Sequence, residues 1–157
     1  MRQTFSLPAL LAFFFAMCWS SSVFAAPRVS LKKPSFFGGS YTYALNGYDT
    51  TTYWSGRLKK GKKAFKYRYR GVTWLFASAA NKDKFKANPQ KYAPQYGNYC
   101  AWAIADGSLA AGDPTVWSIV NGKLYLNYNK GIRKKWEKKP ASFIKKANSQ
   151  WPSILNK

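Results

Sequence analysis

Cys100, in the stretch YGNYCAWAIADG, offers the plainest chemistry in the sequence. A thiol can ligate a soft metal ion, act as a nucleophile or redox group, or fill space in a core. The chain has no histidine, and its other cysteine, Cys18, lies in a segment that we expect to be removed. A zinc site needs three or four protein ligands, so a conventional site within one chain is all but excluded. Copper(I) could use methionine sulfur as a ligand, but Met1 and Met17 lie in the same removed segment. The metal site that remains open is one in which two chains each contribute the Cys100 thiolate.

Catalysis by Cys100 would need a base or a lowered thiol pKa. No histidine can serve, although helix N-terminal amides and a positive field could lower that pKa. The five acidic residues form no adjacent pair, and no glycine-rich phosphate loop or serine motif is present. The pattern therefore favours a small buried Cys100 over a ligand or sensor thiol, and either of these over a nucleophile. The acidic residues are Asp49, Asp83, Asp106, Asp113 and Glu137.

Positive charge is the most unusual bulk property. The chain holds 26 lysines and arginines against five acids, and removal of Arg2 with the leader lowers the net charge from +21 to +20. Such a field attracts polyanions, so an anionic membrane surface or lipopolysaccharide is a candidate partner, and a merely solubilising surface is the alternative. Specific nucleic-acid binding is not expected, because FKYRYR alternates rings and charges onto opposite strand faces. The candidate anionic-surface residues are Arg57, Lys59, Lys60, Lys62, Lys63, Lys66, Arg68, Arg70, Lys134 and Lys135.

Residues 1–25 have the features of a secretory signal peptide. A basic start precedes an apolar stretch from Leu7 to Trp19, and the segment ends in Val23-Phe24-Ala25, which suits cleavage after Ala25. The apolar stretch is too short for a membrane span and no later span follows. We therefore expect an exported protein, periplasmic in a Gram-negative cell and otherwise secreted. A lipoprotein anchored at Cys18 is the less favoured alternative.

The rest of the chain predicts one small α+β domain. Residues 26–46 are predicted to be an extended N-terminal segment, and Asp49 to cap a short helix, with a metal or substrate carboxylate as its alternative role. Hairpins are expected over 65–76 and, around Asn121-Gly122, over 115–128. Between them, Ser78 opens a central helix with Ala79, Ala80 and Phe85 inward, and 99–105 form a short buried helix. Two C-terminal helices follow, with inward stripes at Ile132 and Trp136, and at Phe143, Ala147, Trp151 and Leu155.

Residues 47–155 resemble the exported proteins of the YHS-domain family. The matching stretches are GYDTTTYWSG, FKYRYRGVTWLFASAANKDKFKANPQKYAPQYGNYCAWAIADG, GDPTVWSIVNGKLYLNYN and the tail from Trp136 to Trp151-Pro152. The resemblance implies a YHS-like core and a link to metal handling. Metal-handling relatives carry cysteines near Asp49 to Thr51 and around the first hairpin, where this chain has none, so only Cys100 carries over as a ligand.

The leading hypothesis is an exported, non-enzymatic binding protein of the YHS type. Its ligand would be a metal ion, a metal complex or a small molecule near Cys100, and no particular cofactor is implied. The alternatives are a basic module that binds anionic lipid or lipopolysaccharide, and a thiol-dependent redox enzyme. The candidate ligand residues are Cys100, Tyr99, Tyr96, Tyr48 and Asp49.

Overall fold

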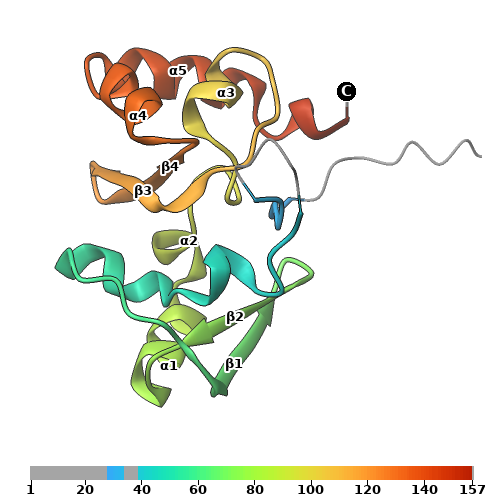
Figure 1. Cartoon of the computed structure of the whole chain (residues 1–157), viewed down its shortest axis with the longest axis vertical. Helices are drawn as coiled ribbons and strands as arrows, with labels where there is room; N and C mark the ends of the chain where they lie inside the picture. The colour runs from blue at the N-terminus through green and yellow to red at the C-terminus, as the bar shows by residue number, and fades with distance from the viewer. Residues whose placement is uncertain (1–27, 34–38, 157) are drawn as a thin grey trace, which may run out of the picture.

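The computed structural model describes residues 28–33 and 39–156, so the predicted signal peptide lies outside the described residues. Within these ranges, two antiparallel hairpins are combined with short helices, which confirms the predicted α+β class. Figure 1 shows three layers along the long axis. The β1–β2 hairpin and α1 lie at one end, the β3–β4 hairpin crosses the middle, and α3, α4 and α5 lie at the other end.

The first layer begins with two 3₁₀ turns, η1 (Ala44–Gly47) and η2 (Thr50–Ser55). Strands β1 (Lys62–Tyr69) and β2 (Val72–Phe76) follow, and then helices α1 (Ala79–Ala87) and α2 (Pro89–Tyr92). In β1, Phe65, Tyr67 and Tyr69 are half-buried and the alternating Lys66 and Arg68 are exposed, which confirms the predicted separation of rings and charges.

Helix α1 begins where the sequence predicts, because the hydroxyl of Ser78 accepts a hydrogen bond from the amide of Asn81 at 3.2 Å. Phe85 is buried as expected. The inward orientation predicted for Ala79 and Ala80 is wrong, since both are exposed. The inner face of the helix instead carries Asn81, whose side chain binds Asp49, and Phe85 one turn later.

The second hairpin pairs β3 (Asp113–Val120) with β4 (Lys123–Asn127), with Ile119 opposite Leu124. Asn121 and Gly122 have φ of 50° and 68°, which confirms the predicted tight turn. Strand β4 separates two hydrophobic clusters. Leu124 and Leu126 face the cluster built on the first layer, and Tyr125 between them faces the cluster under the helices.

The helical layer consists of α3 (Ala101–Ala105), α4 (Lys130–Trp136), α5 (Pro140–Gln150) and the 3₁₀ turn η3 (Ser153–Asn156). The stripe predicted from Phe143 to Leu155 packs into the second cluster, but it is not carried by one helix. Helix α5 ends at Gln150 because Pro152 disfavours a helical conformation at Trp151. No helix in the described ranges is both long and apolar enough to span a bilayer.

Candidate functional site

Cys100 lies at the junction of the helical layer and the central hairpin. Its main chain forms a bridge with Leu126 of β4, and its amide donates to the carbonyl of Ala110 at 2.9 Å. The residue is the N-cap of α3 and only 1% exposed. The prediction that it is a small buried residue is therefore confirmed.

The thiol has a neutral hydrogen-bonding environment. Its Sγ accepts from the backbone N–H of Tyr128 at 3.3 Å, and its S–H faces Oδ1 of Asn127 at 3.8 Å. Burial raises the pKa of the Cys100 thiol, and the backbone N–H groups of Ala103, Tyr128 and Trp102 offset part of that effect. The folded protein therefore favours the protonated thiol over the nucleophilic thiolate.

A hollow of about 280 Å³ adjoins this buried thiol. Its walls come from three places in the sequence: α3, the segment before β3, and the start of the C-terminal tail. We call it the Cys100 hollow; its lining residues are Cys100, Trp102, Ala103, Ala110, Tyr128 and Ile132. The walls carry few polar groups, so the hollow can take a small apolar molecule against the thiol.

The candidate tyrosines lie outside the lining of this hollow. Tyr48 packs on the first hydrophobic cluster, with the ammonium of Lys60 3.7 Å from its ring centroid. Tyr96 and Tyr99 belong to the second cluster, where both rings contact Trp151. Burial raises the pKa of both phenols, so both remain protonated at neutral pH.

Asp49 is fully buried and its carboxylate is already saturated. Oδ1 accepts from the amide and the hydroxyl of Thr51 at 2.9 and 2.8 Å. Oδ2 accepts from the amide of Ala77 at 2.8 Å and from the side chain of Asn81 at 2.7 Å. The predicted cap is confirmed, and the same carboxylate also ties η2 to the end of β2 and to α1.

Of the residues that line the hollow, Cys100 is the one that the sequence predicted as a candidate ligand residue. Trp102 and Ala103 lie within three residues of Cys100, and Ile132 was expected to face inward, so the sequence contained a signal for these three. Ala110 and Tyr128 carried none, because only the packing of the loop before β3 and the end of β4 brings them to the thiol.

The predicted basic residues are all exposed, but they do not form one face. Strand β1 and helix α4 lie at opposite ends of the long axis in Figure 1. The basic side chains of β1 therefore lie far from Lys134 and Lys135 of α4. In the described part of the chain, the one ion pair is Arg133–Glu137 at 2.8 Å, so the other exposed cations have no carboxylate partner.

Comparison with known protein families finds a match within the first layer. The YHS domain matches residues 55–96, which include β1, β2, α1 and α2. The chain contains a YHS domain. Cys100 lies four residues beyond the matched range of that domain, and the helical layer follows it. No curated protein and no solved structure matches the chain.

A YHS domain suggests a metal-associated binding role, but the donors found here do not fit a metal ion held by one chain. Among the described residues, no three Cys, Asp, Glu or His side chains lie together in a group that could hold a metal ion. The Cys100 thiol favours its proton, and its polar side-chain neighbour is a neutral amide. The oxygens of Asp49 are occupied by four hydrogen bonds.

Proposed function

We propose that this YHS-domain protein is an exported, non-enzymatic binding protein whose ligand occupies the Cys100 hollow. The observation that carries the proposal is the hollow itself, which places apolar walls around the single thiol of the described chain. Burying an apolar molecule there gains about 25 cal/mol for each Å² removed from water. The ligand class is therefore a small, mainly apolar molecule that contacts the sulfur of Cys100.

The non-enzymatic part of the proposal rests on the state of the thiol. The sequence contains no histidine to act as its base, and burial raises the pKa of Cys100. Both features disfavour attack by a thiolate at neutral pH.

Filling the hollow provides the test. The chain of residues 26–157 is titrated with Nile red, a neutral probe that the positive surface does not attract. We expect saturable binding of one dye per chain, lost in Ala103→Leu, because the added methyl groups occupy the hollow. The matched control, Ala141→Leu, adds the same group at an exposed position of α5 outside the hollow and should bind like the wild type.

A second experiment distinguishes an apolar ligand from a metal ion. Wild type and Cys100→Ser are exposed to copper(I), zinc(II) and iron(II), and the bound metal is measured by elemental mass spectrometry. No stoichiometric metal in either protein is expected. Stoichiometric metal that disappears in Cys100→Ser would overturn the apolar-ligand proposal, as would dye binding that Ala103→Leu leaves unchanged.

A second candidate is association with an anionic lipid or lipopolysaccharide surface. It is favoured by the exposure of all ten predicted basic residues and by their lack of carboxylate partners within the described chain. The two candidates are compatible, because the basic side chains do not line the Cys100 hollow.

A further inference from the structure

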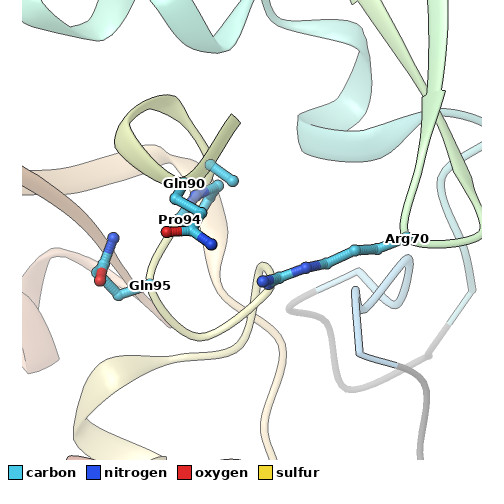
Figure 2. A pocket seen from close by; sticks show the side chains of 5 residues that line it. Arg70, Gln90, Pro94 and Gln95 are labelled. Atoms are coloured by element: carbon cyan, nitrogen blue, oxygen red, sulfur yellow. The ribbon is translucent and has the colours of Figure 1, made fainter. Parts of the chain in front are cut away.

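A polar cleft of about 160 Å³ lies between the turn of the β1–β2 hairpin and the loop after α2. We call it the Arg70 cleft; it is lined by Arg70, Gln90, Ala93, Pro94 and Gln95. Figure 2 shows Arg70 extending from the hairpin turn and Gln90 on the other side of the cleft, while the side chain of Gln95 extends away from Arg70. It has no lining residue in common with the Cys100 hollow.

The side chains around the cleft are donors suited to an oxyanion. A guanidinium presents a planar fork of N–H groups that matches a carboxylate or a phosphate, and each glutamine amide adds two N–H donors. None of the five lining residues is acidic, and Arg70 has no ion pair in the described chain. Its guanidinium carbon lies 5.2 Å from the ring centroid of Tyr69.

The glutamine wall of the cleft is held in place by the main chain. The amide of Ala93 donates to the carbonyl of Pro89 at 2.8 Å, which closes the turn of α2. The amide of Gln95 donates to the carbonyl of Leu124 in β4 at 2.9 Å. Because Ala93 and Pro94 are also buried, the two glutamines project from a fixed backbone.

The conformation of Arg70 is one that the turn does not favour. Its φ is 49° and that of Gly71 is 79°, nearly the same as at Asn121 and Gly122 in the second hairpin. A left-handed φ disfavours most side chains but is well tolerated by asparagine and glycine. The turn thus explains Asn121 and does not explain Arg70, which points to a role for the guanidinium beyond the hairpin.

Arg70 also lines an apolar recess of about 210 Å³, together with Val29, Leu31, Gly71 and Val72. The segment that forms one wall of this recess is anchored, because the amide of Ser30 donates to the carbonyl of Gly97 at 2.7 Å. An oxyanion at the guanidinium would therefore have apolar surface beside it, which can accept a short apolar substituent.

We propose that Arg70 and Gln90 bind the oxyanion group of a small ligand, a carboxylate or a phosphate, with an apolar substituent placed against Val29 and Val72. The site is distinct from the Cys100 hollow and does not depend on the function proposed for it.

The experiment follows side-chain and backbone amides by nuclear magnetic resonance while sodium phosphate, acetate or hexanoate is added at constant ionic strength. We expect saturable shifts at the side-chain amide of Gln90 and at Nε of Arg70. If the apolar recess takes the substituent, hexanoate should bind at least tenfold more tightly than acetate. If phosphate binds but hexanoate binds no more tightly than acetate, the site recognises phosphate groups and the apolar recess takes no substituent.

Arg70→Asn is the decisive variant, because it removes the guanidinium and leaves an Asn-Gly turn of the kind found in the second hairpin. Its thermal unfolding midpoint should equal or exceed that of the wild type, while its oxyanion affinity should fall at least tenfold. Arg68→Gln is the matched control, since it removes the same charge from an exposed position of β1 that does not line the cleft.

Gln90→Leu provides a second variant that keeps the net charge. It should weaken binding several-fold while Arg68→Gln leaves binding unchanged. Shifts that stay linear in anion concentration, or that are equal in Arg70→Asn, Arg68→Gln and the wild type, would overturn the proposal and assign the effect to the general positive field.

Discussion

At the residue scale, Asp49 is a buried carboxylate held by neutral donors. Four hydrogen bonds from Thr51, Ala77 and Asn81 reach its two oxygens. The bonds link three elements that are separated along the chain, so the carboxylate stabilises the tertiary arrangement as well as the turn that it caps. Bonds to an ionised acceptor contribute more than bonds between neutral groups, which makes the charge of Asp49 part of its structural role.

Asp49→Asn should therefore be strongly destabilising. Each carboxylate oxygen accepts two hydrogen bonds, so in either orientation of the new amide its NH₂ group faces two donors that have lost their acceptor. We expect the free energy of unfolding, measured by urea denaturation, to fall by about 2 to 4 kcal/mol. Asp83→Asn removes an exposed charge from α1 and should change the value by less than about 0.5 kcal/mol. Equal effects of the two substitutions would contradict the role assigned to Asp49.

Cys100 should make stability depend on alkaline pH. Burial raises the pKa of its thiol, so the folded protein retains the proton where the unfolded chain, with a thiol pKa of about 8.5, has lost it. The contribution to stability is fully present below about pH 8 and decreases as the pH rises past 8.5. We expect the stability difference between wild type and Cys100→Ala to shrink, by at most about 1.4 kcal/mol per pH unit.

The measurement is urea unfolding of both proteins between pH 6.5 and 9.5. Between pH 6.5 and 7.5 the difference should be constant, which provides the internal control. A difference that stays constant up to pH 9.5, or that grows, would show that the thiol is not held in its neutral form.

At the element scale, the N-terminal segment is locked across the loop after α2. Val29 is buried in the first cluster, and the carbonyl of Ser30 accepts from the side chain of Asn98 at 3.1 Å. Gly97 allows this close approach, because a Cβ at that position would lie 1.7 Å from the carbonyl oxygen of Arg28. Part of the segment predicted to be extended therefore contributes to the core.

Gly97→Ala should displace this segment. The clash is with main chain rather than with a flexible side chain, and the φ of 55° adds backbone strain. We expect a loss of about 3 kcal/mol or more in the free energy of unfolding and loss of hydrogen-exchange protection at the amide of Ser30. Gly56→Ala is the control: its φ of 68° is also left-handed but a Cβ there meets no atom within 4 Å, so it should lose only about 1 kcal/mol. Full protection of Ser30 in Gly97→Ala would contradict the locked arrangement.

At the scale of the whole molecule, the distribution of charge matters more than its sum. Exposed cations of β1 and of α4 lie at opposite ends of the long axis in Figure 1. Two membranes perpendicular to the long axis could each contact one of these ends. A protein with this distribution is expected to bridge anionic surfaces as well as to bind them.

Vesicles that contain anionic lipid should therefore cluster when the protein is added, which dynamic light scattering would detect. Replacing Lys62, Lys66 and Arg68 by glutamine should abolish clustering while the α4 end still binds, and replacing Lys130, Lys134 and Lys138 should act in the same way from the other end. Both binding and clustering should fall steeply between 0.05 and 0.5 M salt, because the Debye length shrinks from roughly 14 to roughly 4 Å. Binding that is unaffected by salt would contradict the electrostatic interpretation.

Features that depend on residues close in the chain could be predicted from the amino-acid sequence alone. They include the Asn121-Gly122 turn, the caps at Asp49 and Ser78, and the alternation along β1, because each depends on backbone preferences or on contacts within a few residues. The YHS resemblance could also be recognised from the sequence. The burial of Cys100 also followed from its small, apolar neighbours.

Contacts between residues distant in the chain became clear from the packing of the folded protein. The walls of the Cys100 hollow come from α3, the loop before β3 and the C-terminal tail, and the Arg70 cleft joins a hairpin turn to a loop some twenty residues later. The exposure of Ala79 and Ala80 was hidden for the same reason, since the saturated carboxylate of Asp49 draws Asn81 to the inner face of α1. Contacts of this kind depend on how whole layers pack, and the periodicity of one element does not encode its neighbours.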